Sequence, residues 1–392
     1  MNPFAALKVA LVHHWLVTRR GGEHVFEAMA DHFPAADIYT LVSDPANLSS
    51  ALRNRLIRSS MLQKLPYASR LYPYYLPLFP AAVSRLDLTG YQLIISSDAA
   101  VVKGVRADPG AVHLCYCHTP MRCVWTGYES YYDAAGAATR IGLSAMRNWV
   151  RKWDYDAAQR VTLFIANSRN VQKRIKDCYG RESVVIYPPV DIEKFVLGGP
   201  NEPSNDFFLV VSQLVPYKRV DLLVEAFNRC GKKLLVIGDG PARRKLERSA
   251  KSNIRFLGAQ SRKTVVRAMQ QCTAFVFAGE EDFGIVMAEA QACGKPVIAF
   301  AGGGAQEIVQ PGVSGVLFEE QGADSVLDAV ERFDPRCFDA PTIRSLALRF
   351  GRERFQREFS SFLRSIIHNP ASLECHEKSS GCLDPSAVAA RC

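Results

Sequence analysis

The chain has 392 residues, of which 48% are hydrophobic and 22% are charged, and its formal net charge is +9. This composition is typical of globular proteins, and no apolar run approaches the roughly 18–20 residues of a membrane-spanning helix, so an integral membrane protein is excluded. The length favours two domains, and the positive charge favours an anionic partner such as a phosphorylated substrate, a nucleic acid or a membrane surface.

Short apolar runs recur in the first half of the chain, with helical stretches between them. The first, KVALVHH at Lys8, follows an N-terminus without the cleavage site of a signal peptide, so we expect a strand there and a cytoplasmic protein. The other runs are ADIYTLV, QLIISS, VHLCYCH, TLFIANS and SVVIYPP. Continuous apolar strands that alternate with helices indicate a parallel sheet covered on both faces. We therefore predict a Rossmann-like domain over residues 1–200.

A Gly-Gly pair follows the first predicted strand, in RRGGEHVFEAMADHF. Gly21 and Gly22 would form a tight turn at the start of a helix, where backbone amides can hold an anion without a charged side chain. An ordinary strand-to-helix turn has the same pattern. Both interpretations therefore stay open.

Residues 51–90 form a basic aromatic segment, with six Arg or Lys residues against one Asp. Its central part, LPYASRLYPYYLPLFP, has four prolines, which argue against one continuous amphipathic helix. No nucleic-acid-binding signature accompanies it. Basic residues attract an anionic leaflet, and Tyr72, Tyr74, Tyr75 and Phe79 could enter its interface, so we expect loops and short helices that face a membrane. A solvated face over a core helix is the alternative.

Two patterns resemble metal sites but lack the context of one. The 11 cysteines have no C-x-x-C pairing, and CYC at Cys115–Cys117 is too tight for structural zinc, which favours incidental thiols. DYD at Asp154–Asp156 has the form of a D-x-D metal motif, but the surrounding MRNWVRKWDYDAAQRV is a helical pattern rather than a loop after a strand. We therefore expect no bound metal.

A second series of apolar strands follows the Gly- and Pro-rich break at 198–206. Its members are FFLVVSQ, KLLVIG, IRFLG, AFVFAG and PVIAFA, which predict a second Rossmann-like domain over residues 206–340. GDGPARRKLE at Gly238 lacks a full G-x-G-x-x-G, which disfavours a dinucleotide oxidoreductase. Residues 341–367 have helical spacing and should pack back on the first domain, and the polar tail 368–392 should be disordered.

The stretch GEEDFGIVMAEAQA contains the DFG tripeptide of protein kinases, but the chain has no H-R-D loop, so Asp282 is not a kinase metal ligand. Phe283 and Gly284 instead turn the chain from a strand into a short helix. Glu281 then precedes the helix and Glu289 lies about one turn inside it, so both carboxylates can face one cleft. Carboxylates there suit the hydroxyls of a sugar and a ribose, and the helix N-terminus suits a diphosphate.

Glu281 and Glu289 match the E-x7-E motif of the retaining family 4 glycosyltransferases, and the chain resembles that family over roughly residues 7–367. Other matching segments are GGEHV, ANSRNVQKRI, VIYPPVD, LVPYKRVDLLVEAFN, VIGDGP and IRFLG. YCHTPMRCVW and LDLTGYQLIISSDAAVVKGV are most similar to the subgroup of mannosyltransferases of bacterial O-antigen and exopolysaccharide assembly. The resemblance implies the α/β GT-B fold, with two Rossmann-like domains facing a central cleft and a C-terminal helix that crosses back to the first domain.

The resemblance also implies which residues bind the diphosphate of a nucleotide-sugar donor. Lys218 matches the family's diphosphate-binding lysine, which offsets the charge on the leaving nucleoside diphosphate. Gln213 stands where the family often has an arginine, so the second phosphate cation is open, with Arg219 a candidate. Gly284 and Ile285 lie at the helix start that would cradle the diphosphate.

Further residues are implied around the sugar and the ribose. Glu281 matches the residue that holds the donor sugar near its anomeric carbon, and Glu289 matches the one that binds the ribose. His118 matches a cleft histidine beside the donor sugar, whereas a single histidine after a strand is more often structural. Gly21 and Gly22 would also contact the donor.

The predicted activity is the transfer of mannose from GDP-mannose to a polyprenyl-diphosphate-linked saccharide at the inner face of the cell membrane. The resemblance favours retention by attack on the face from which the phosphate departs, without a metal cofactor. The alternatives are a UDP-sugar 2-epimerase of the same fold and an inactive sugar-nucleotide-binding module. The E-x7-E spacing argues against the first, and the presence of Lys218 and both glutamates argues against the second. The base, the sugar, the acceptor and the linkage are left open.

Overall fold

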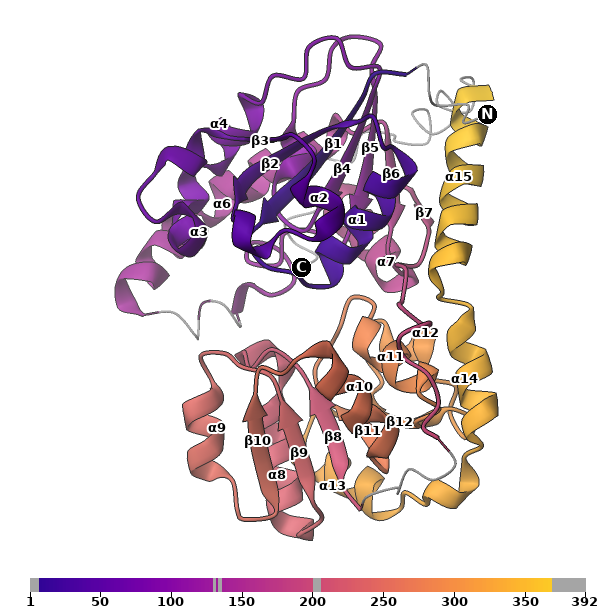
Figure 1. The fold of residues 1–392 in the computed structure, drawn as a ribbon. Coiled ribbons are helices and arrows are strands. Elements are labelled where there is room, and N and C mark those ends of the chain that lie inside the picture. Colours follow the sequence, from indigo (N-terminus) through magenta and orange to yellow (C-terminus); the bar gives the residue numbers. More distant parts are fainter. Residues whose placement is uncertain (1–6, 130–131, 133–135, 200–205, 369–392) are drawn as a thin grey trace. The chain divides into compact units, whose positions relative to one another are not determined.

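A computed structural model describes residues 7–129, 132, 136–199 and 206–368 of the chain (Figure 1). Its contacts divide the chain into two compact units, one formed by residues 1–187 and 355–392 and the other by residues 188–354. We call them the first and the second unit. The predicted break at 198–206 and the predicted disordered tail at 368–392 fall largely outside the described residues.

The first unit contains seven parallel strands in the order β3-β2-β1-β4-β5-β6-β7. The strands are β1 (Val9–Leu16), β2 (Asp37–Ser43), β3 (Ile57–Ser59), β4 (Leu93–Asp98), β5 (Val112–Cys117), β6 (Leu163–Ala166) and β7 (Ser183–Val185). Chain order reverses between β1 and β4. In doubly wound sheets, ligands bind at the carboxyl ends of the strands beside such a reversal.

Helices cover both faces of this sheet, as its continuous apolar strands require. Ala10 and Val12 of β1 belong to one buried cluster, and Val9 and Leu11 belong to another on the opposite face. The first cluster includes residues of α4, α6 and α7, and the second includes residues of α1 and α15. The helices of this unit whose bounds lie within the described residues are α1 (Gly21–His32), α2 (Ser50–Arg53), α3 (Ala68–Leu71), α4 (Phe79–Ser84), α6 (Ala137–Gln159), α7 (Arg169–Tyr179) and most of α15 (Arg352–His368).

The basic aromatic segment consists of short pieces, as predicted. It runs through α2, β3, the 3-10 helix η2 (Met61–Lys64), α3, the 3-10 helix η3 (Tyr72–Leu78) and α4. The prediction that Phe79 is free to enter a membrane is wrong, because Phe79 is only 3% exposed and packs in the core. Tyr72 and Tyr75 pack partly buried against the same cluster, whereas Tyr74 is 73% exposed. No helix among the described residues is both long enough and apolar enough to cross a membrane.

The second unit repeats the architecture with six parallel strands in the order β10-β9-β8-β11-β12-β13. The strands are β8 (Phe208–Val211), β9 (Leu234–Ile237), β10 (Ile254–Gly258), β11 (Ala274–Phe277), β12 (Val297–Phe300) and β13 (Gly315–Phe318). The helices are α8 (Val220–Cys230), α9 (Arg243–Ser249), α10 (Arg262–Gln271), α11 (Ile285–Ala292), α12 (Ala305–Ile308), α13 (Ala323–Glu331) and α14 (Ala340–Leu348). Chain order reverses here between β8 and β11. The predicted pair of Rossmann-like sheets is confirmed.

The C-terminal region differs from the single helical segment predicted for 341–367. It forms two helices, α14 in the second unit and α15, whose residues from Phe355 onward group with the first unit. Phe355 and Phe359 are fully buried in the cluster that α1 also lines. Residues 188–199, expected in the first domain, group with the second unit because Arg344 donates to the carbonyls of Phe195 and Ile192 at 2.6 and 3.3 Å.

Candidate active site

Lys218 and Glu281 meet at the point of the second unit where chain order reverses. Lys218 ends the 3-10 helix η5 (Pro216–Lys218), which follows β8, and Glu281 lies in the loop after β11. The ammonium of Lys218 forms an ion pair with a carboxylate oxygen of Glu281, and the two side chains are 13% and 23% exposed. The predicted phosphate cation and the predicted sugar ligand are therefore in contact, in a place that solvent still reaches.

Glycines fix the backbone of the loop that carries Glu281. A Cβ on Gly279 would lie 2.8 Å from the Lys218 carbonyl oxygen, and one on Gly303 would lie 2.1 Å from the Glu281 carbonyl oxygen. The amide of Gly304 donates to the same Glu281 carbonyl at 2.8 Å. The loop is thus held between the η5 turn and the Gly302–Gly304 turn, at approaches that no side chain would allow.

Gly284 precedes the first residue of α11, Ile285. Its φ of +97° lies in the left-handed region, which favours glycine, and a Cβ there would also displace the end of the flexible Met287 side chain. The first amides of α11 have no partner within the helix and carry its positive dipole end. A Cβ on Gly284 would also lie 3.6 Å from the Glu281 Cβ, which places this helix N-terminus beside the Lys218–Glu281 pair.

Glu289 lies further along α11 and is 9% exposed. One of its carboxylate oxygens accepts from Arg262 at 3.0 Å, and Arg262 also pairs with Asp191 at 3.2 Å. Burial raises the pKa of Glu289 to about 7, although the Arg262 guanidinium acts in the opposite direction. Sequence reasoning found Glu289 but missed Arg262, which belongs to none of the family-like segments. Asp191 is the last residue of the family-like segment VIYPPVD, but the sequence did not indicate a role for it.

Arg219, the candidate second phosphate cation, has an unusual backbone. Its φ of +50° is left-handed, and it caps α8. Its guanidinium contacts Asp221 at 3.4 Å and Gln321 at 3.3 Å. Strain of this kind at a non-glycine residue is concentrated at functional sites, and here it adjoins Lys218.

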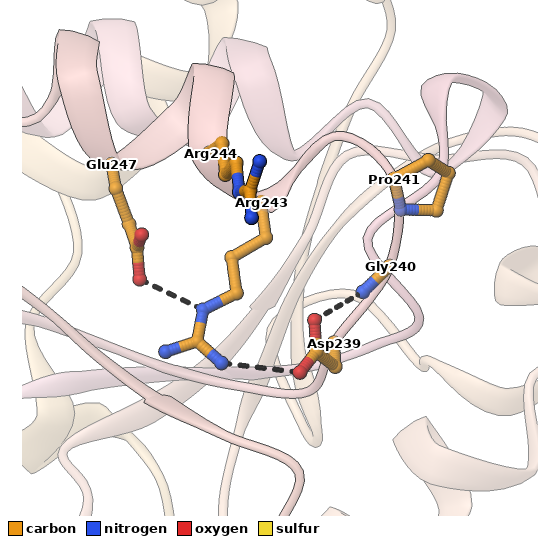
Figure 2. A pocket seen from close by; sticks show the side chains of 6 residues that line it. All are labelled: Asp239, Gly240, Pro241, Arg243, Arg244 and Glu247. Carbon is orange, nitrogen blue, oxygen red and sulfur yellow. Dashed lines mark hydrogen bonds and ion pairs between the residues drawn. The ribbon is translucent and has the colours of Figure 1, made fainter.

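A pocket of about 550 Å³ opens at the end of β9, lined by the loop Asp239–Pro241 and the start of α9 (Figure 2). Arg243 lies between Asp239 and Glu247 at 3.1 and 2.8 Å. A Cβ on Gly240 would lie 2.4 Å from the Leu214 carbonyl oxygen, so this loop packs directly on the chain that leads from β8 to Lys218. The pocket and the Lys218–Glu281 pair therefore share one edge of the sheet.

His118, Gly22 and Ser97 come together in the first unit, at the carboxyl ends of β5, β1 and β4. His118 Nε2 lies 2.8 Å from Ser97 Oγ, and a Cβ on Gly22 would lie 3.7 Å from the same nitrogen. Gly21 and Gly22 begin the 12-residue helix α1. The Glu23 carboxylate caps its first turn by accepting a hydrogen bond from the Arg20 amide at 3.0 Å. The sequence predicted the histidine and the glycines but not the serine.

The DYD motif is structural in this chain. Asp154 is fully buried, forms an ion pair with Lys103 at 2.5 Å, and accepts hydrogen bonds from Trp125 at 2.9 Å and from Tyr179 at 2.7 Å. Asp156 points to solvent and pairs with Lys152 at 2.9 Å. Within the described part of the chain, no three His, Cys, Asp or Glu side chains are grouped so that they could hold a metal ion.

Two family profiles match the chain in succession. One is described as Glycosyltransferase Family 4 and matches residues 19–194, and the other is described as Glycosyl transferases group 1 and matches residues 198–333. A D-inositol 3-phosphate glycosyltransferase of Mycolicibacterium gilvum is 30% identical over 299 residues, which cover 68% of this chain and 65% of that protein.

The name of a second relative specifies its donor. The GDP-mannose-dependent monoacylated alpha-(1-6)-phosphatidylinositol monomannoside mannosyltransferase of Corynebacterium glutamicum is 28% identical over 222 residues, or 49% of this chain and 57% of that protein. The chain spans about half the length of the first curated relatives it matches. Among solved structures, HepE of Anabaena in complex with UDP and glucose superimposes with a TM-score of 0.66 at 19% identity, over 92% of this chain and all of that one. The chain has the GT-B fold and belongs to the family 4 (group 1) glycosyltransferases.

Proposed function

We propose that the protein is a retaining glycosyltransferase that transfers mannose from GDP-mannose to a lipid-linked saccharide in the synthesis of a bacterial surface polysaccharide. The observation that carries the proposal is the contact between Lys218 and Glu281 beside the N-terminus of α11. A cation, a carboxylate and a set of helix amides at one sheet edge fit the diphosphate and the sugar of a nucleotide-sugar donor.

Lys218 and the amides at Gly284 and Ile285 bind the donor diphosphate, and Arg219 is the second cation. As the sugar leaves, negative charge builds on the diphosphate, and these groups stabilise it without a metal. Glu281 accepts hydrogen bonds from sugar hydroxyls. Before the donor binds, the ammonium of Lys218 and the carboxylate of Glu281 neutralise each other. When the donor binds, its diphosphate replaces Glu281 as the partner of Lys218, and its sugar hydroxyls replace Lys218 as the partner of Glu281.

Glu289 binds the ribose, and the pocket at Asp239–Glu247 offers space for the nucleoside. Arg262 holds one carboxylate oxygen of Glu289 and orients the other. From the first unit, family resemblance assigns His118 to the donor sugar and Gly21 and Gly22 to donor contacts.

Transfer requires one bond to break and one to form at the anomeric carbon. The bond from that carbon to the phosphate oxygen breaks, and its electron pair goes to the oxygen. The acceptor hydroxyl bonds to the same face of the carbon and gives its proton to the departing phosphate, so the configuration is retained. The positive charge on the sugar in the transition state is offset by the phosphate itself.

Two observations support GDP-mannose as the donor, namely the mannosyltransferase-like segments of the first half and the Corynebacterium relative whose name specifies that donor. The HepE complexes contain UDP and UDP-glucose, so a UDP-sugar is the competing donor to be tested beside it.

The basic aromatic segment supports a lipid-linked acceptor. Exposed apolar side chains gather there, with Tyr67 and Tyr74 each 73% exposed, and Leu71 and Leu78 beside them. Exposed arginines and lysines on the same short helices suit an anionic leaflet. We propose that this surface brings the enzyme to the inner face of the cell membrane, where a polyprenyl-diphosphate-linked acceptor carries its diphosphate.

The test is transfer of labelled sugar. The full chain is incubated with GDP-mannose or UDP-glucose, each labelled in the sugar, and with a polyprenyl-diphosphate-linked saccharide. The proposal expects label from GDP-mannose in the lipid fraction only when the acceptor is present, with an α linkage in the product. Release of free sugar and free nucleotide without an acceptor would instead indicate the epimerase, and a chain that binds a nucleotide sugar but neither transfers nor releases its sugar would indicate the inactive module.

A further inference from the structure

A chain of hydrogen bonds leads from the interior of the first unit to His118. His13 and Ser97 are paired neighbours on β1 and β4, and both are fully buried. Ser97 Oγ lies 3.0 Å from His13 Nδ1 and 2.8 Å from His118 Nε2. We propose that Ser97 and His13 are positioning residues that hold the His118 ring in one orientation with its proton on Nδ1, an inference whose catalytic meaning rests on the proposed function.

His13 determines which atoms donate and which accept along this series of hydrogen bonds. Burial, with the neighbouring rings of His14 and His118, lowers the pKa of His13 well below its usual range, so this imidazole is neutral and has one N–H. Its Nε2 is buried and has no hydrogen-bond partner among the described residues. An N–H at that position would be a buried donor without an acceptor, which folded proteins rarely tolerate. His13 therefore carries its proton on Nδ1 and donates it to Ser97.

The position of the His13 proton determines the position of the His118 proton, because the Ser97 hydroxyl between them has only one proton to donate. Since its oxygen accepts from His13, its proton is directed to the other neighbour, His118 Nε2. His118 Nε2 must then be an acceptor, and a neutral His118 has its proton on Nδ1. The backbone of Ser97 adds a further restraint, because its carbonyl accepts from His14 Nδ1 at 3.1 Å.

The ring of His13 is itself held in place. It stacks on Phe26 of α1 with ring centroids 4.8 Å apart, and it lies 4.0 Å from the ring of His14. The series of hydrogen bonds runs from His13, inside the unit, to His118. The helix that begins at Gly21 and Gly22 therefore packs on its inner end, at His13. The orientation of His118 is thereby fixed by side chains far from it in sequence.

This arrangement decides what His118 can do in the reaction. Nε2 is occupied by Ser97 and cannot take a proton unless both hydrogen bonds reverse. His118 is then suited to donate a hydrogen bond from Nδ1 to an oxygen of the donor, rather than to act as a general base through Nε2. That role is consistent with a transfer in which the departing phosphate receives the acceptor's proton.

The experiment is an NMR measurement of the histidine ring nitrogens. The full chain is labelled with 15N in histidine, and the His118 signals are identified by their loss in His118→Asn. The ring nitrogen shifts report directly which nitrogen carries the proton. We expect a protonated Nδ1 and an unprotonated Nε2 in the wild type, and a mixture of the two tautomers in Ser97→Ala, with turnover lower by about tenfold to a hundredfold.

The adjacent Ser96 provides a matched control. Ser96 is equally buried on the other face of β4, and its hydroxyl contacts His113 Nε2 at 2.9 Å. Ser96→Ala thus removes the same kind of bond at the same depth and should leave the His118 signals and turnover unchanged. The wild-type measurement needs only His118→Asn to identify its signals, so the test does not depend on how well Ser97→Ala folds.

A wild-type His118 with its proton on Nε2 would overturn the inference. So would an unchanged tautomer in folded Ser97→Ala, or an equal change in Ser96→Ala. If wild-type His118 shows the Nδ1 tautomer while His118→Asn retains full turnover, the positioning chain stands and the role of His118 in the proposed function is wrong. The two failures are therefore separable.

Discussion

In the proposed function, Lys218 and Glu281 carry most of the chemistry of the second unit, and before the donor binds each supplies the charge that the other needs. Removing either one deletes a contact to the transition state and leaves its partner without a counter-ion. We predict that Lys218→Ala and Glu281→Ala each lower turnover at least about a hundredfold, as expected for the loss of one strong electrostatic contact. The measurement is kcat for sugar transfer.

The control for this pair is Asp328→Ala, which removes an exposed ion pair of the same unit, with Arg332 at 2.7 Å. An exposed pair contributes little, so this variant should match the wild type. Near-normal turnover in folded Lys218→Ala or Glu281→Ala would show that the residue concerned has been assigned wrongly.

Glu289 makes the stability of the protein depend on pH in a defined direction. Its folded pKa of about 7 lies above the ordinary value of 4.5, so between these values the folded protein keeps a proton that the unfolded chain has lost. Its contribution is therefore most favourable at acid pH and is lost as pH rises through 7. Glutamine has no such dependence.

We predict that the Tm of Glu289→Gln, relative to the wild type, increases by roughly 3–8 °C between pH 5 and pH 8. Thermal unfolding followed by circular dichroism at several pH values measures it. Glu225→Gln makes the same change at an exposed position of α8 and should give a constant difference. A pH-independent difference for Glu289→Gln would mean that this carboxylate is ionised throughout the range.

At the scale of elements, the Gly302–Gly304 turn is what aligns the Glu281 loop. Gly303 has a φ of +60°, and a side chain there would collide with the Glu281 carbonyl. Gly312 has a φ of +76° but nothing within 4 Å of a Cβ, so alanine at Gly312 reports the backbone strain alone. We predict that Gly303→Ala lowers both Tm and kcat, whereas Gly312→Ala lowers Tm by less and leaves kcat unchanged. Equal effects of the two substitutions on kcat would contradict this explanation of the loop.

The basic aromatic segment should bind anionic membranes through its exposed residues. The charge-removal variant is chosen from the structure: Arg55 is excluded because it donates to the carbonyls of Ala30 and Phe33 at the end of α1, at 2.9 Å each. Arg58 is excluded as well, because its guanidinium donates to the Tyr39 hydroxyl at 3.3 Å and lies 3.9 Å from the Asp37 carboxylate. Four other exposed basic residues remain for replacement by glutamine, namely Arg53, Lys64, Arg70 and Arg85. Each basic residue near an anionic leaflet contributes about 1 kcal/mol, so binding at low salt should weaken at least about tenfold.

Co-sedimentation with vesicles that contain anionic lipid measures this binding. The control changes four exposed basic residues of the second unit to glutamine, namely Lys245, Arg248, Lys263 and Arg332. The control should bind like the wild type. Equal loss in both variants would indicate a general charge effect, and a wild type that never binds at low salt would rule out the membrane surface.

The sequence predicted the elements whose apolar runs are long and missed those that tertiary contacts define. β1 and β4 were evident from continuous runs, whereas β3 and β13 are short strands at the edges of their sheets, with no such signal. The helical pattern of 341–367 continues through Gly351, but the structure breaks it there, where Val190 and Gly351 form a β-bridge. A helix break that is caused by contact with a distant segment has no signal in the local sequence.

Across the whole molecule, too, residues in local motifs could be predicted, whereas residues whose role depends on tertiary contacts could not. Lys218, Glu281 and Gly284 could be predicted because each lies in a local motif that follows a strand. Ser97 and Arg262 could not, because each acquires its role from a partner on another element. In each unit the sheet reverses chain order between its first and fourth strands. Motifs of one unit that are far apart in the sequence therefore meet at the carboxyl ends of the strands beside that reversal, as Lys218 and Glu281 do in the second unit.

Binding of a nucleotide sugar through its diphosphate, at the edge of the second unit that carries Lys218, precedes every other step proposed for this protein. Isothermal titration of GDP-mannose into the full chain, with UDP-glucose in parallel and with chelator present throughout, measures this binding. We predict saturable binding of GDP-mannose at one site per chain, unaffected by chelator, at least about tenfold weaker in Lys218→Ala and unchanged in Asp328→Ala. Binding that is equally strong in Lys218→Ala, or no binding of either nucleotide sugar by the wild type, would refute this assignment of the site.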